Sequence, residues 1–174
     1  MDPLTDIEAE WTNYFTAVAG ASGAIFGLLF LGVQFKSAHW RNDSLRVYGA
    51  VVALWEVAAP LLVSLIVLMP HSTWETAATV VGTTGATIAV GHLAALCWRI
   101  RRPGKHGSIR WPDSARICAG SIGSGALFGL LLISPQRFDP PIALATIAWT
   151  CLFLVVLGII DAFVFLANWQ ALHK

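Results

Sequence analysis

The chain has 174 residues, of which 56% are hydrophobic and 12% are charged, whereas about a quarter of an average soluble domain is charged. Too few polar side chains are present to cover the surface of a soluble fold, so the composition excludes an ordinary soluble domain. The 11 basic and 10 acidic side chains give a net charge of +1. This balance argues against a nucleic-acid partner, which would favour a strongly basic protein.

Five stretches are long and apolar enough to be transmembrane helices. Such a helix needs about 20 apolar residues to cross a hydrocarbon layer about 30 Å thick. In chain order the stretches are about Phe15–Phe35, Val47–Met69, Thr76–Trp98, Ala115–Ser134 and Ile142–Ala167. The connectors between them are short. We therefore predict an all-α fold in which residues 1–174 form one integral membrane bundle of five helices.

The first, third and fourth stretches carry small residues at intervals of three or four, which places them on one face of each helix. Small residues let helix backbones approach closely in lipid, where apolar side chains alone give little driving force. We expect these faces to pack within one subunit or between subunits, which favours a homo-oligomer. The glycines concerned are Gly20, Gly23, Gly27, Gly82, Gly85, Gly125 and Gly129.

The first stretch combines Trp11 and an aromatic pair with a Gly/Ala-rich segment that ends in Gly-Leu-Leu-Phe. The residues are Trp11, Tyr14, Phe15, Ala19, Gly20, Gly23, Gly27, Leu28, Leu29 and Phe30. This pattern resembles that of small uncharacterised bacterial multipass membrane proteins, some of which are labelled modulators of a membrane protease. The resemblance implies a location in the bacterial cytoplasmic (inner) membrane.

A shorter pattern, Gly20-Ala21-Ser22-Gly23, resembles the serine motif of rhomboid intramembrane proteases. In that family the serine is paired with a histidine two spans later, where this chain has His92. The resemblance implies Ser22 as nucleophile and His92 as base. Residue counting, however, puts the two about 13 Å apart along the membrane normal, and such a pair needs about 3 Å. Protease activity is therefore a remote alternative, and we predict a protein that is not an enzyme.

The second stretch contains an acid, Glu56, about 14 Å from the end of the span at about 1.5 Å per residue. A charge at the centre of a membrane helix costs about 2.5–3.5 kcal/mol on insertion scales, so it should face protein or water. Pro60 follows four residues later and has no N–H for the Glu56 carbonyl, which predicts a helix kink. Glu56 thus offers a carboxylate and a free backbone carbonyl oxygen at the same depth in the membrane. Ser64, Thr83, Thr84 and Thr87 could line the same route.

Two further ionisable groups, His92 and Asp161, lie in the third and fifth stretches, about 9 Å from the same side of the membrane. With Glu56 they form a candidate proton or ion site. The alternative is structural, in which Glu56 is protonated and bonded to a threonine while Asp161 pairs with His92 or an arginine. A single intramembrane histidine does not provide two axial haem ligands. We predict no metal and no cofactor.

The third connector and its borders are basic, through Arg99, Arg101, Arg102, Lys105 and Arg110. Ten of the 11 basic residues fall in the first and third connectors, the adjoining helix ends and the C-terminal tail. Basic residues in short loops are retained in the cytoplasm, which predicts an outside N-terminus and a cytoplasmic C-terminus. The basic connector could also contact anionic lipid or a protein partner.

These observations favour a non-enzymatic multipass membrane protein that passes or senses protons or small cations, such as a channel or transporter. Glu56 is the principal predicted site, and Asp161 and His92 are secondary. The alternative is an accessory or regulatory subunit that binds another membrane protein. The expected partners are the lipid bilayer, further copies of the chain and a membrane protein.

Overall fold

The computed structural model describes residues 3–37, 44–69, 73–101 and 111–167, and it is helical nearly throughout. The helices are α1 (Pro3–Ser37), α2 (Ser44–Val67), α3 (Trp74–Arg101), α4 (Trp111–Arg137) and α5 (Pro140–Ala167). All five are long and apolar enough to cross a membrane. The predicted all-α class and the five spans are therefore confirmed.

Local sequence explains where two of these helices begin. Thr73 precedes α3, and its hydroxyl oxygen accepts a hydrogen bond from the backbone N–H of Thr76 at 3.2 Å, as an N-cap residue does. Pro140 opens α5, at a position where the missing N–H has no helical partner to lose. The Asp139 carbonyl then accepts the first bond of α5, from Ala143 at 2.8 Å.

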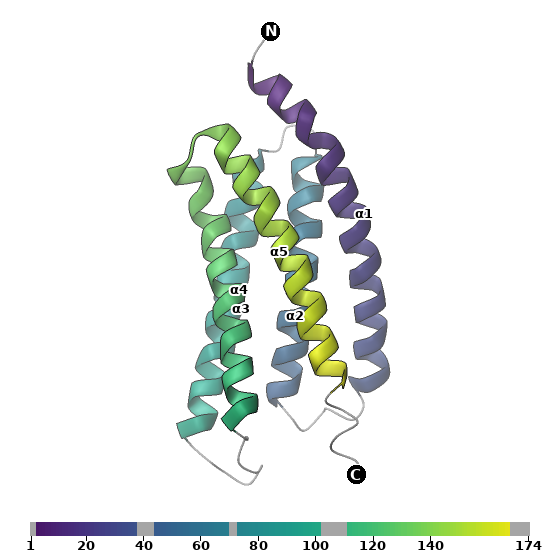
Figure 1. Ribbon diagram of the computed structural model, residues 1–174, viewed down its shortest axis with the longest axis vertical. Helices are drawn as coiled ribbons and strands as arrows, with labels where there is room; N and C mark the ends of the chain where they lie inside the picture. Colours follow the sequence, from purple (N-terminus) through teal and green to yellow (C-terminus); the bar gives the residue numbers. More distant parts are fainter. Residues whose placement is uncertain (1–2, 38–43, 70–72, 102–110, 168–174) are drawn as a thin grey trace.

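The helices run alternately up and down in one bundle (Figure 1). Helix α2 packs against α1, α3 and α5, and α4 packs against α3 and α5. Half of the α2 span is buried, whereas only 6% of the α1 span is buried. Helix α2 is therefore central and α1 is peripheral. We call the end at which α1, α3 and α5 begin the N-terminal end, and the opposite end the C-terminal end.

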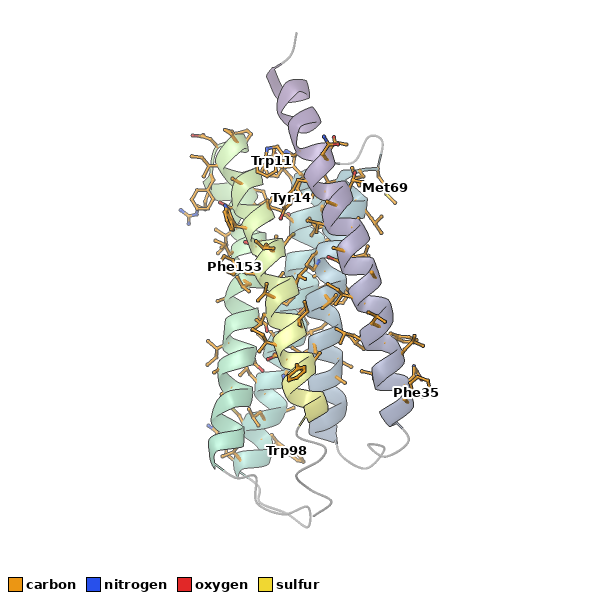
Figure 2. The ribbon with its side chains drawn as sticks, turned by 45° about the vertical axis from the view of Figure 1, so that its right-hand side comes forward. Trp11, Tyr14, Phe35, Met69, Trp98 and Phe153 are labelled. Carbon is orange, nitrogen blue, oxygen red and sulfur yellow. The ribbon has the colours of Figure 1, made fainter. Side chains whose placement is uncertain are left out.

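Large apolar side chains cover the outside of the bundle, as expected for surfaces that contact lipid. Leu28 is 71% exposed and Phe163 is 72% exposed. Figure 2 shows Trp11, Tyr14 and Met69 near the N-terminal end and Phe35 and Trp98 near the other. Aromatic residues at both ends of the spans are typical of membrane interfaces. The apolar surface and the five helices together indicate a multipass membrane protein.

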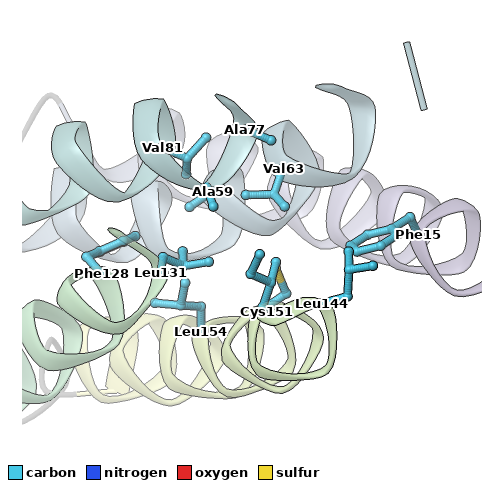
Figure 3. Close-up of a cluster of buried hydrophobic side chains, with 12 residues drawn as sticks. Phe15, Ala59, Val63, Ala77, Val81, Phe128, Leu131, Leu144, Cys151 and Leu154 are labelled. Atoms are coloured by element: carbon cyan, nitrogen blue, oxygen red, sulfur yellow. The ribbon is translucent and has the colours of Figure 1, made fainter. Parts of the chain in front are cut away.

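The N-terminal half of the bundle holds the apolar core. The core is built from small and branched side chains of all five helices, with Phe15 at one edge and Phe128 at the other (Figure 3). Its members are Phe15, Ala59, Val63, Ala77, Ala78, Val81, Phe128, Leu131, Leu144, Ile147, Cys151 and Leu154. We refer to this set as the apolar core.

Glycines set the distance between α3 and α4. A Cβ atom on Gly82 would lie 2.9 Å from the backbone nitrogen of Leu132, and one on Gly85 would overlap the ring of Phe128. Gly125 faces Ala89, with 3.7 Å between a Cβ on Gly125 and the Ala89 Cβ. The close approach expected from the small residues of the third and fourth spans is thus present between α3 and α4.

The glycines of α1 have a different environment. A Cβ on Gly20 or Gly27 would meet nothing within 4 Å, and the same is true of Gly129 on α4. Gly23 is in ordinary contact with Leu61 of α2, at 3.8 Å. A face of α1 that the sequence assigns to helix packing is therefore open within this single chain.

Candidate functional site

The centre of the bundle contains a buried acid. Glu56 lies midway along α2 and is 0% exposed. Its Oε1 accepts a short hydrogen bond from the hydroxyl of Ser124 on α4. Its Oε2 is buried and has no hydrogen-bond partner among the described residues. A buried polar atom without a partner is costly in a low-dielectric interior, so the Glu56 carboxyl group is a candidate site for a proton or a ligand.

The small residue Gly158 holds α5 directly against this acid. A Cβ at position 158 would lie 3.1 Å from the Glu56 Cβ and 2.6 Å from Cγ2 of Val57. It would also lie 3.3 Å from the carbonyl oxygen of Ala53. Only a glycine lets the α5 backbone come this close, so Gly158 encloses Glu56 between α2, α4 and α5.

A second acid, Asp161, lies one turn after Gly158 on α5. Its carboxylate oxygens are 3.1 and 3.5 Å from the position of a Cβ on Gly120 of α4. The Gly120 carbonyl in turn accepts a hydrogen bond from Ser124 Oγ at 3.0 Å. Both acids therefore border the same turn of α4.

The histidine reaches α4 from the other side. His92 on α3 is buried, and its Nδ1 lies 2.9 Å from the Ser121 hydroxyl oxygen. Ser121 and Ser124 are three residues apart on α4, so they lie on one face of that helix. We call Glu56, Asp161, His92, Ser121 and Ser124 the polar cluster.

The structure thus brings together the three ionisable residues that the sequence singles out. Ser121 and Ser124, which connect them, have no such role in the sequence analysis. Serine is common on small faces that only pack, so its presence between glycines gives no signal of its own. The one available clue is the three-residue spacing of the two serines on the face that also carries Gly125.

Several predicted contacts are absent. Thr83, Thr84 and Thr87 are exposed, and each donates its hydroxyl hydrogen to a carbonyl of its own helix, at 2.7–2.9 Å. They do not line a route to Glu56. This bonding back to the helix is common for membrane threonines.

The rhomboid-like pairing is not formed either. Ser22 is buried in α1, but its hydroxyl has no hydrogen-bond partner among the described residues. His92 pairs with Ser121 instead.

Pro60 is buried within α2, which stays helical on both sides of it.

No lysine or arginine whose side chain is described is buried beside Glu56. Arg101 and Arg137 are exposed at the ends of α3 and α4, and no group of three metal-ligating side chains is found in the part of the chain that the structure describes. Of the predicted basic connector, Arg102, Lys105 and Arg110 lie outside the described residues, as does the side chain of Arg99. Among the described residues, the acid therefore has a hydroxyl partner and no ion pair with a lysine or arginine.

No protein-family model, curated protein or solved structure matches this chain. The site must consequently be interpreted from its own geometry.

Proposed function

We propose that this protein passes or senses a proton or small cation at Glu56, and that the site is reached from the C-terminal end of the bundle. The observation that carries the proposal is the fully buried carboxyl of Glu56, whose Oε2 has no hydrogen-bond partner among the described residues. Ionisable residues inside membranes are costly and are usually tied to ion or proton pathways. A purely structural role would be expected to satisfy both carboxyl oxygens.

The direction of access follows from the distribution of polar groups. His92 and Asp161 lie between Glu56 and the C-terminal end, whereas the apolar core occupies the bundle from Glu56 towards the N-terminal end. Water and ions enter polar interiors more readily than packed apolar ones. In the sequence, most basic residues fall in or beside the connectors between α1 and α2 and between α3 and α4. We therefore propose that the C-terminal end faces the cytoplasm of a bacterium and that the N-terminus is outside.

The test uses the full chain reconstituted in lipid vesicles with dyes for pH and for monovalent cations inside. If the protein passes ions, it gives a flux that Glu56→Gln abolishes. If it senses them, it gives no flux but shows a change in tryptophan fluorescence with external pH or salt, and Glu56→Gln removes that change.

The matched control is Glu75→Gln, because Glu75 is exposed in the first turn of α3. This variant should behave as the unmodified protein. If Glu56→Gln leaves flux and fluorescence response both intact, or if the unmodified protein shows neither, the proposal is wrong.

One observation favours a second function, that of an accessory subunit. The α1 span is 6% buried, and Gly20 and Gly27 face open space. Close helix approach through glycines is typical of membrane helix association, so α1 could contact another copy of the chain or a different membrane protein. Cysteines introduced at positions 20 and 27 would crosslink to a dominant partner in cells if this is so. Absence of any crosslink would count against it.

A further inference from the structure

Ser124 has two acceptors for one hydrogen. Its Oγ lies within hydrogen-bond distance of Glu56 Oε1 and also 3.0 Å from the carbonyl oxygen of Gly120. A serine hydroxyl carries one hydrogen and can also accept hydrogen bonds. It cannot donate fully to both oxygens, so either Glu56 donates to Ser124 or the Gly120 carbonyl does not receive the Ser124 hydrogen.

The protonation state of Glu56 decides which arrangement forms. A charged Glu56 can only accept hydrogen bonds. Ser124 then donates its hydrogen to Glu56, and the Gly120 carbonyl receives no hydrogen from Ser124. A neutral Glu56 carries a hydrogen of its own. It can donate that hydrogen to Ser124 Oγ, while Ser124 donates to Gly120. Both arrangements use the same oxygen positions, so the exchange needs only the hydroxyl hydrogen to rotate.

The groups that face Glu56 favour a proton over a metal cation. On α5 the carboxylate of Asp161 lies against Gly120 of α4, the residue whose carbonyl bonds Ser124, and on α3 His92 is held by Ser121. The titratable group described on α1 is Tyr14, whose hydroxyl donates to the Ala148 carbonyl at 2.6 Å. Among the described side chains, α4 adds only Cys118 and the distant, exposed Arg137, and α2 adds no other titratable group.

These neighbours fall short of the ligand set that a divalent metal ion requires. Calcium takes about 6–8 oxygen ligands and magnesium requires a near-octahedral set. The described oxygens available to an ion near Glu56 are its own Oε2, the Asp161 carboxylate, and the Glu56 backbone carbonyl, which Pro60 leaves without a helical N–H. A proton needs one acceptor only, and Ser124 already provides the hydrogen bond that each form of the acid requires.

We propose that the species exchanged at Glu56 is a proton, and that Ser124 is a positioning residue whose hydroxyl hydrogen turns from Glu56 to the Gly120 carbonyl when Glu56 is protonated. This inference rests on the proposed function, because it names the species that the same site binds. The Ser121–His92 pair, one turn nearer the C-terminal end of the bundle, is the next group able to exchange a proton.

Infrared difference spectroscopy on the full chain in vesicles tests this directly. Spectra recorded at acid and alkaline pH should show the carbonyl band of a protonated carboxylic acid that shifts in D₂O and is lost in Glu56→Gln. In Ser124→Ala the band should move to higher frequency, because the acid loses its acceptor. In Ser124→Thr, which keeps a hydroxyl, it should return towards its original position.

The control is Ser134→Ala on the same helix. Ser134 is buried but donates to the Leu131 carbonyl of α4 itself, at 3.1 Å, so its loss should leave the band unchanged. If Ser124→Ala does not fold, Ser124→Cys takes its place, since a thiol is a weak donor and acceptor of similar size. A band that is unmoved in the folded Ser124 variant would overturn the role of Ser124.

The two proposals fail in different ways. If no carboxylic acid band appears at any pH while vesicles show a cation flux that depends on Glu56, the exchanged species is a cation and the proton inference is wrong, although the proposed function stands. If the band behaves as expected but Glu56→Gln changes neither flux nor fluorescence, the proposed function is wrong while the role of Ser124 stands.

Discussion

The two halves of the bundle are built in different ways. The N-terminal half is held by the apolar core, whose members are mostly aliphatic and fully enclosed. Its buried Ser134 and Thr150 donate to their own helices. In the C-terminal half, and at the level of Glu56, buried hydroxyls instead link different helices, through the Ser124–Glu56 and Ser121–His92 contacts.

The two halves of the bundle are therefore suited to different roles. Apolar packing excludes water and gives no chemical selectivity, whereas hydrogen bonds between helices fix register and hold titratable groups. A protein in which the second half were only structural would not need an acid with a free oxygen. The comparison therefore predicts that substitutions in the two halves have distinct effects.

The largest effect on stability is expected from Leu131→Ala in the apolar core. Leu131 is 0% exposed, and removing a buried leucine side chain costs about 2–5 kcal/mol because a cavity remains. Leu130, its neighbour, is 39% exposed and provides a matched control with the same change to alanine. Denaturant unfolding in mild detergent should show a large loss for Leu131→Ala and a clearly smaller one for Leu130→Ala. Equal losses would contradict a packed core in this half.

A smaller effect is expected from serine to alanine changes in the two halves of α4. Ser124→Ala removes the described hydrogen-bond partner of Glu56 Oε1, so that neither carboxyl oxygen has a described partner. Leaving this further buried oxygen without a hydrogen bond costs about 1–3 kcal/mol. Ser134→Ala removes a bond within one helix, and polar contacts in membrane proteins average about 0.6 kcal/mol. Free energies of unfolding should therefore fall more for Ser124→Ala. The reverse order would mean that the polar cluster does not hold the helices together.

The smallest effect is expected from Tyr14→Phe, which removes the bond from α1 to the Ala148 carbonyl of α5. The loss should be about 0.6 kcal/mol, with faster proteolysis or crosslinker access at α1. Thr16→Ala is the control, because Thr16 is exposed and donates to Thr12 in its own helix. If Tyr14→Phe unfolds the whole bundle, α1 is more firmly attached than its exposure indicates.

Sequence patterns predict the spans well because hydrophobic length is a local property. The same is true of Glu56, since an acid in an apolar helix must avoid lipid wherever its neighbours are. The hydrogen-bond partners of Glu56 could not be predicted from the sequence. Ser124 is 68 residues away in the chain, and its role depends on how α2, α4 and α5 rotate about their axes, which no local pattern contains.

The glycines illustrate the same limit. Gly82, Gly85 and Gly125 lie at a helix contact, whereas Gly20, Gly27 and Gly129 do not, although the spacing in the sequence is alike. Small residues show which face of a helix permits close approach. They do not show whether a partner helix is present in the same chain.

The contact between Gly120 and Asp161 has a consequence for how this site can be altered. A methyl group at position 120 would come 3.1 Å from an Asp161 oxygen, which is the mobile end of a side chain and can move aside. A side chain at position 120 would therefore displace the Asp161 carboxyl group without changing either acid. A single methyl group added to α4 could thus shift the position of one carboxyl group relative to the other.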